Sequence, residues 1–279
     1  MHAFACAAPI ELGGGDRVLF ASDVHLGDHD PETARGFEDA LRAHAAHASH
    51  LFVLGDLFEA WVGDDGADQV SQRTVALLAE LAGAGLRVHV MRGNRDFLLD
   101  VPAGGRPDSP SGSATHEAPA RSFARRVGAT MLVDPCTVML FGRAALLAHG
   151  DAMCTDDVDY LRFRELTRSA EWQRDFLSRP LEERQAVARD LRARSELSKA
   201  GKAEELMDVN AHAVQAAMSE AGVRLLIHGH THRPAHHALR VDGQAAERWV
   251  LPDWDARLGR GGMLLASADG FERLGSWPC

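Results

Sequence analysis

The chain has 279 residues, 46% of them hydrophobic, and a formal net charge of -10 at pH 7, so it can bury the core of one large domain, while its acidic balance argues against general nucleic-acid binding. No apolar run of about 18 residues is present to span a membrane, and the apolar N-terminus lacks the basic segment of a secretory signal peptide. The four cysteines are scattered without paired spacing, which predicts a reduced, cytoplasmic protein.

The first third of the chain alternates strands and helices. Apolar runs predict strands at 17–21, 51–54 and 87–91, and Ala- and Leu-rich segments predict helices at 32–47 and 69–82. Such alternation is typical of an α/β fold, in which ligands bind beyond the carboxyl ends of the strands.

The rest of the chain predicts shorter elements. These are a helix near Phe123, strands at 137–141 and 144–148, a helix at 204–221, a buried strand at 223–227, and four C-terminal strands at 236–241, 248–251, 263–267 and 271–274. We expect the C-terminal strands to form a second sheet. Two sheets between helices give a four-layer αββα sandwich, and we predict a single domain over residues 1–279.

Two segments interrupt this pattern. Residues 101–119 are rich in Pro, Gly and Ser and predict a flexible surface loop. Residues 158–203 contain eleven Lys or Arg among dispersed apolar residues such as Trp172, Phe176, Leu177 and Leu181. They predict a helical insertion, which is either a solvated amphipathic helical pair or a lid that carries cations over an anionic substrate.

Seven polar side chains fall at the predicted carboxyl ends of strands. They are Asp23, His25, Asp56, Asn94, His149, His228 and His230. Any one of them alone is more often a cap or turn residue, but the joint arrangement predicts ligands of two divalent ions. Imidazole, carboxylate and amide donors without Cys favour Mn²⁺, Fe²⁺ or Zn²⁺, and Asp56 is the expected bridging carboxylate.

Two of these histidines flank Gly229 in the segment 227–234. A glycine between them allows a sharp turn, so that His228 and His230 could point at one spot instead of opposite faces of a continuing strand. We therefore expect both to bind metal.

The motifs together resemble a known family. Asp-x-His at 23–25, Gly-Asp at 55–56, Gly-Asn-Arg-Asp at 93–96, His-Gly-Asp at 149–151 and Gly-His-Thr-His at 229–232 are similar to those of the calcineurin-like metallophosphoesterases. The stretches 55–61 and 154–157 extend the resemblance to the UDP-2,3-diacylglucosamine pyrophosphatases of lipid A biosynthesis. The loop 101–119 is an insertion relative to that pattern.

The resemblance implies roles for individual residues. Asp23, His25 and His230 would hold one metal, Asn94, His149 and His228 the other, and Asp56 would bridge them. The implied catalytic residues are Asn94, Arg95 and His228. The implied substrate contacts are Asn94, Arg95, Asp157, Ser195, Lys199, Lys202 and His228.

The implied reaction is hydrolysis of the pyrophosphate of UDP-2,3-diacylglucosamine. A metal-held hydroxide would attack the α-phosphorus and give UMP and 2,3-diacylglucosamine 1-phosphate. Many superfamily members have His where this chain has Arg95; arginine cannot act as an acid at neutral pH but can bind phosphate bidentately. A pyrophosphate fits this difference, because a phosphate leaving group needs no proton.

The resemblance and composition also predict partners. Two divalent ions, most consistent with Mn²⁺, and a lipid substrate with two acyl chains are expected, without nucleic acid or an obligate protein partner. Because the substrate is a lipid, we expect peripheral association with the cytoplasmic face of the inner membrane through 158–203. The alternatives are hydrolysis of a nucleotide or other small phosphoester at the same site, a non-enzymatic binding scaffold, and a purely structural metal site.

Overall fold

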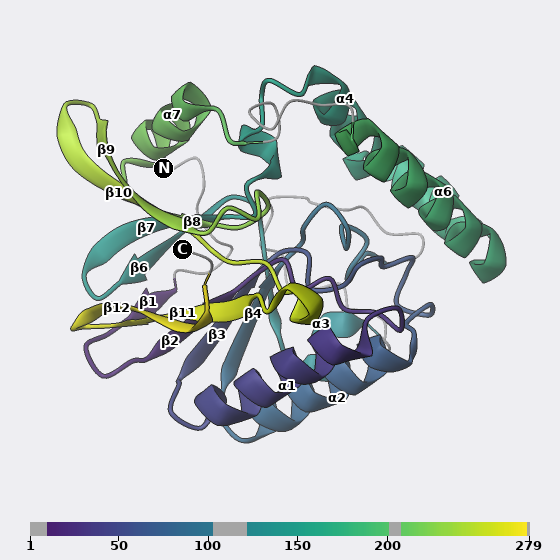
Figure 1. Ribbon diagram of the computed structural model, residues 1–279, viewed down its shortest axis with the longest axis horizontal. Helices are drawn as coiled ribbons and strands as arrows, with labels where there is room; N and C mark the ends of the chain where they lie inside the picture. Colours follow the sequence, from purple (N-terminus) through teal and green to yellow (C-terminus); the bar gives the residue numbers. More distant parts are fainter. Residues whose placement is uncertain (1–9, 103–121, 201–207, 278–279) are drawn as a thin grey trace.

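Figure 1 presents a computed structural model of the chain, which describes residues 10–102, 122–200 and 208–277, except for the side chains of 195–200. Two six-stranded mixed sheets lie face to face. The first has the order β12-β11-β2-β3-β4-β5 and the second β1-β6-β7-β8-β10-β9. This architecture confirms the predicted αββα sandwich.

Both sheets are mixed: the first is parallel from β2 to β5 with antiparallel strands at one end, and the second has one antiparallel pair on each side of its parallel pairings. The first contains β2 (Val18–Ala21), β3 (His50–Leu54), β4 (Arg87–Met91), β5 (Thr130–Leu132), β11 (Gly261–Ser267) and β12 (Gly270–Ser276). The second contains β1 (Glu11–Leu12), β6 (Cys136–Leu140), β7 (Arg143–Ala148), β8 (Leu225–His228), β9 (Ala235–Val241) and β10 (Gln244–Val250).

The C-terminal strands correct one expectation. They do not form a sheet of their own: β9 and β10 extend the second sheet beside β8, whereas β11 and β12 extend the first beside β2. Short C-terminal strands show their own hydrophobic pattern but not their partners, and pairing is decided by which sheet edge is free.

Helices cover the outer faces of both sheets. α1 (Pro31–Ala45), α2 (Gln69–Gly83) and the short α3 (Phe123–Val127) lie on the first sheet, and α7 (Ala211–Ala221) lies on the second. The helix predicted from residue 204 begins at Ala211, because the Asn210 side chain accepts hydrogen bonds from the backbone of His212 and Ala213 as an N-cap; residues 204–207 lie outside the described parts.

Three hydrophobic clusters fill the spaces between the layers. In β2, Leu19 faces the α1–α2 layer while Phe20 faces the other sheet, where it packs with Phe52 and the residues around Ile227. Both faces of these strands are buried, which explains why they are continuous apolar runs instead of alternating ones.

Residues 158–200 contain three helices beside the ends of the sheets: α4 (Val158–Arg168), α5 (Ala170–Ser178) and α6 (Leu181–Ala200). Pro180 separates α5 from α6. Arg184 of α6 is almost fully buried and fixes this helix to the core, because its guanidinium donates to Val62 O at 2.5 Å and to both carboxylate oxygens of Asp65 at 2.8 and 2.6 Å. No described helix is both long and apolar enough to cross a membrane. Residues 103–119 and 201–203 of the two unusual segments lie outside the described parts.

Candidate metal centre

The loops that follow β2 and β3 run side by side and continue the pairing of these strands. Asp23 N donates to Gly55 O at 3.1 Å and His25 N donates to Asp56 O at 3.0 Å. Asp23, His25 and Asp56 have φ angles of 53°, 54° and 52°. Left-handed backbone is uncommon for residues other than glycine and concentrates at functional sites, where surrounding structure holds it.

The first group of converging side chains is Asp23, His25 and His232. Their candidate ligand atoms all lie within 4.8 Å of one another. The Nε2 atoms of His25 and His232 are 3.2 Å apart, and His232 Nε2 is 3.5 Å from Asp23 Oδ1. Asp23 Oδ1 is buried and has no hydrogen-bond partner within the described residues. A buried carboxylate oxygen of this kind, facing two imidazole nitrogens, fits a divalent cation.

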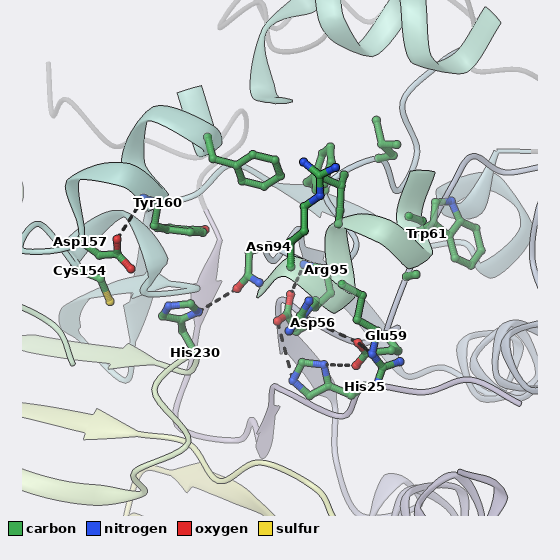
Figure 2. A pocket seen from close by; sticks show the side chains of 18 of the residues that line it. His25, Asp56, Glu59, Trp61, Asn94, Arg95, Cys154, Asp157, Tyr160 and His230 are labelled. Carbon is green, nitrogen blue, oxygen red and sulfur yellow. Dashed lines mark hydrogen bonds and ion pairs between the residues drawn. The ribbon is translucent and has the colours of Figure 1, made fainter. Parts of the chain in front are cut away.

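The second group surrounds Asn94 Oδ1. His149 Nε2 is 3.0 Å and His230 Nδ1 is 2.8 Å from this oxygen. Asp56 lies between the groups, because its Oδ1 is 3.7 Å from His149 Nε2 and its Oδ2 is 3.8 Å from His25 Nε2 (Figure 2). A carboxylate that faces both groups with different oxygens fits a bridging ligand between two ions.

His228, which was expected to join His230, lies elsewhere. The strand β8 continues through His228, which pairs with Ala148 of β7 and Val250 of β10. Its fully buried ring faces Gly229 O with Nδ1, at 2.8 Å, and Arg248 with Nε2, at 3.3 Å. Burial and the Arg248 charge lower the pKa of His228 to about 3.

The chain turns only after His228. His230 and His232 have φ angles of 68° and 53°, so these two imidazoles enter the site from beyond the strand end, one into each group. His232 was missing from the predicted ligands. The spacing His-x-His occurs twice in 228–232, so the ligand pair could be either His228 with His230 or His230 with His232. Which pair enters the site depends on where β8 ends.

Two glycines allow the ligand loops to approach each other. A Cβ atom on Gly93 would overlap Asp56 Oδ1, and one on Gly229 would overlap Asp23 Oδ2 and the Ser22 side chain. Glycine is therefore required at both positions by close packing against the carboxylates.

Asp96 connects the loop that carries Asn94 to the loop that carries Asp56. Its fully buried carboxylate accepts hydrogen bonds from Leu57 N at 2.8 Å and Gly93 N at 2.7 Å. Burial, reinforced by the charge of Asp56, raises the pKa of Asp96 to about 6. The backbone N–H of Arg95 donates to Asp56 Oδ1 at 2.7 Å. This hydrogen bond fixes the backbone of the predicted phosphate-binding arginine next to the central carboxylate.

The carboxylates dominate the electrostatics of the centre. For His232, burial acts to lower the pKa, but Asp23 and Asp253 outweigh it and raise the pKa to about 10. For His149, burial is likewise outweighed by Asp56, Asp151 and Asp23, which raise its pKa to about 9. The negative charge of these carboxylates is the charge that a pair of divalent cations would neutralise.

A cavity of about 660 Å³ opens beside the two groups and extends under α4, α5 and α6. Its lining includes the polar side chains of Arg95, Asp157 and Arg192 and the apolar side chains of Phe97, Leu98, Trp172, Phe176 and Leu191. Asp157 lies at the rim as the N-cap of α4, where it accepts a hydrogen bond from Tyr160 N at 3.1 Å (Figure 2). Of the predicted substrate contacts, the side chains of Ser195 and Lys199 and the whole of Lys202 lie outside the described parts.

Several apolar residues of the insertion face inward. Phe176 and Leu177 are buried and Trp172 is half-buried, with Trp172 and Phe176 stacked at a ring distance of 4.8 Å. Within the described part of this segment, the exposed large apolar residues are Val158, Phe163 and Leu166 of α4. The sequence pattern did not separate them, because both sets are dispersed among arginines.

Comparison with known proteins places these features in a family. The family model for calcineurin-like phosphoesterases matches residues 16–234. UDP-2,3-diacylglucosamine hydrolase of Cellvibrio japonicus is 44% identical over 260 residues, covering 93% of this chain and 98% of the relative. The proteins of the same name from Chromohalobacter salexigens and Bordetella pertussis are each 42% identical; the alignments cover 92% and 91% of this chain and 96% and 93% of the relatives. The matched region contains every element that supplies the two groups of converging side chains, and the chain belongs to the calcineurin-like phosphoesterase family.

Proposed function

We propose that the protein hydrolyses the pyrophosphate bond of UDP-2,3-diacylglucosamine and releases UMP and 2,3-diacylglucosamine 1-phosphate. The proposal is carried by two observations together: side chains arranged to hold two metal ions, and an adjoining cavity lined by both arginines and large apolar residues. The relatives named for this substrate align with this chain over nearly their whole length, so they contain no additional domain that this chain lacks.

We assign the metal ligands from the geometry. One ion would be held by Asp23, His25 and His232, the other by Asn94, His149 and His230, with Asp56 shared. Mixed nitrogen and oxygen donors suit Mn²⁺, which we propose as the preferred ion. When bound, such a pair activates water and neutralises charge on a phosphoryl group.

The protein's own residues then bind and orient the substrate. Arg95 lines the cavity next to Asn94, and a guanidinium can bind phosphate oxygens through two parallel N–H bonds. No proton donor is needed for the leaving group, because the departing sugar phosphate is already a stable anion. Asp157 at the cavity rim is proposed as a further contact, and Ser195, Lys199 and Lys202 are proposed from the resemblance alone.

The apolar lining of the cavity supports a lipid over a nucleotide as substrate. Phe97, Trp172, Phe176 and Leu191 together offer a surface that a sugar nucleotide without acyl chains would leave uncovered. Each buried CH₂ of an acyl chain is worth about 0.8 kcal/mol. We further propose that the protein acts at the cytoplasmic surface of the inner membrane, with the exposed residues of α4 toward the lipid.

The test is hydrolysis of UDP-2,3-diacylglucosamine by the purified protein with added Mn²⁺ in ¹⁸O-water. We expect UMP that carries the solvent oxygen, because attack at the α-phosphorus places the new oxygen on the nucleotide product. Asp56→Asn is the inactive control and should lose at least ~100-fold in rate, since even an outer partner of a metal ligand is worth about 10–100-fold. Faster hydrolysis of free nucleotides or a nitrophenyl phosphodiester than of the lipid would contradict the proposed substrate.

A further inference from the structure

The carboxylate of Glu59 lies between the metal centre and the arginines of the cavity. Glu59 follows Asp56 in the loop after β3, where its backbone N–H donates to Leu26 O at 3.0 Å. The side chain is only 11% exposed. Its two oxygens face different partners: Oε2 is 3.0 Å from His25 Nδ1 (Figure 2), and Oε1 is 3.2 Å from Arg192 Nε.

The contact with His25 holds the orientation of that ring. With Nδ1 against the Glu59 carboxylate, Nε2 lies on the side of the ring away from Glu59. Nε2 faces Asp56 Oδ2 at 3.8 Å and His232 Nε2 at 3.2 Å. Glu59 therefore orients the ring so that Nε2 is directed at the proposed first metal position.

The contact with Arg192 fixes a side chain that is otherwise loosely held. Arg192 lies on α6, and its side chain is 44% exposed, so without a partner its long chain would sample many rotamers. Arg95 approaches the same oxygen, with its Nε 3.9 Å from Glu59 Oε1. One carboxylate oxygen thus gathers two guanidinium groups from two separate parts of the chain at the cavity.

We propose that Glu59 is a positioning residue that links the first metal site to Arg95 and Arg192 of the cavity, so that α6 and the metal centre are energetically coupled. This inference rests on the proposed function for the role of the arginines. The metal part of it stands on the contact with His25 alone. Glu59 itself would touch neither the metal nor the substrate.

The experiment compares Glu59→Gln with Glu38→Gln. Glu38 also pairs with an arginine, Arg73 at 3.3 Å, but between α1 and α2 and away from the cavity. Mn²⁺ affinity is measured by competition with a chelator, and KM and kcat are measured on UDP-2,3-diacylglucosamine. In Glu59→Gln we expect affinity for one of the two ions to fall by about 10–100-fold and KM to rise on the order of 10-fold, with an unchanged melting temperature. In Glu38→Gln neither quantity should change.

A second measurement separates positioning from general damage. Arg192→Gln is made alone and together with Glu59→Gln; coupled residues give non-additive effects, so the rise in KM caused by Arg192→Gln should be several-fold smaller in the Glu59→Gln background. Additive effects would overturn the link to α6, and equal Mn²⁺ affinities at both sites in Glu59→Gln and wild type would overturn the link to His25. If Glu59→Gln does not fold, Glu59→Asp serves the same measurements with smaller losses expected. Absence of turnover in the wild type would refute the proposed function, while the Mn²⁺ titration would still decide the role of Glu59.

Discussion

The three histidines of the segment 228–232 have the same chemistry but different surroundings. His228 ends a buried strand and faces Arg248, whereas His230 and His232 follow the turn and face Asn94 and Asp23. A positive neighbour disfavours a bound cation, and a buried carboxylate favours one. The position at which β8 ends, and not the residue type, therefore determines which of these histidines can bind a metal ion.

This difference predicts opposite effects for two matched substitutions. His232→Asn should lower the metal content from two ions per chain toward one and reduce the rate at least ~100-fold, because it removes a nitrogen from the first group. His228→Asn should keep both ions, because its ring faces no other proposed ligand. The metal content after gel filtration distinguishes them, and loss of metal only in the His228 variant would reverse the assignment made here.

At the scale of elements, α4 is attached to the metal centre by one face. Tyr160, Arg164 and Arg168 are spaced by four residues and so share a side of the helix. Asp151, two residues after His149, accepts hydrogen bonds from Tyr160 Oη at 2.5 Å and Arg164 Nε at 2.8 Å. Arg168 donates to Gly93 O at 2.8 Å. The helix thus contacts the loops that carry Asn94 and His149 through hydrogen bonds instead of apolar packing.

We expect this polar face to be important for stability. Arg164→Ala should lower the free energy of unfolding by about 1.5–3 kcal/mol, because Asp151 is fully buried and loses a charged hydrogen-bond donor. The control is Arg162→Ala on the same helix: Arg162 pairs at 3.5 Å with Asp159 in solvent, and its loss should change stability by less than about 0.5 kcal/mol. Urea unfolding measures both, and similar effects of the two variants would show that the Asp151 contacts contribute little.

Outside this polar face, α4 exposes apolar side chains. Leu166 is 56% and Phe163 37% exposed, and Phe163 also lines the cavity. A lipid substrate must pass from a bilayer into this cavity, so an apolar surface next to it would shorten the path.

The membrane part of the proposal predicts that these apolar side chains of α4 matter for binding to lipid. Phe163→Ser with Leu166→Ser should reduce binding to vesicles that contain anionic lipid by roughly 10-fold, since each apolar side chain contributes up to about 1.5–3 kcal/mol when buried. Leu258→Ser is the matched control, because Leu258 is 64% exposed but lies in the short helix next to α1. Cosedimentation with vesicles measures the binding, and equal retention by both variants would exclude α4 as the contact surface.

At the scale of the whole molecule, the centre joins the two sheets. Asp23, Asp56 and Asn94 follow β2, β3 and β4 of the first sheet, and His149, His230 and His232 follow β7 and β8 of the second. A bound ion would therefore connect the two sheets of the sandwich at the ends of these strands, where the carboxylates of Asp23 and Asp56 place negative charge.

Metal binding should accordingly stabilise the fold. A ligand at 100 times its Kd adds about 2.7 kcal/mol per site, which for a chain of this size corresponds to a rise in Tm of roughly 5–10 °C. Thermal unfolding of chelator-treated protein with and without Mn²⁺ measures the shift, and Asp56→Asn should show a smaller one. An equal shift in Asp56→Asn would mean that Mn²⁺ binds elsewhere.

Much of this molecule follows from local sequence patterns. The buried runs around Leu19, Phe52 and Val90 predict the central strands, because strands covered on both faces must be apolar throughout. Asp23, Asp56, Asn94 and His149 could be placed at one edge for the same reason, since the polar residue that ends a buried parallel strand lies at its carboxyl end.

Other features depend on contacts between distant residues. The sheet that each C-terminal strand joins is decided by which edge remains free, and the role of His232 is decided by the pairing that extends β8 through His228. The orientation of Trp172 and Phe176 into the cavity depends on α5 and α6 packing against the core through Arg184 and Asp65. The sequence alone determined most of the helices and strands and the polar residues at their ends, because these depend on burial and local backbone preference. Only the tertiary structure decided which strand ends meet. Hydrogen-bond pairing and packing act between segments that are far apart in the sequence.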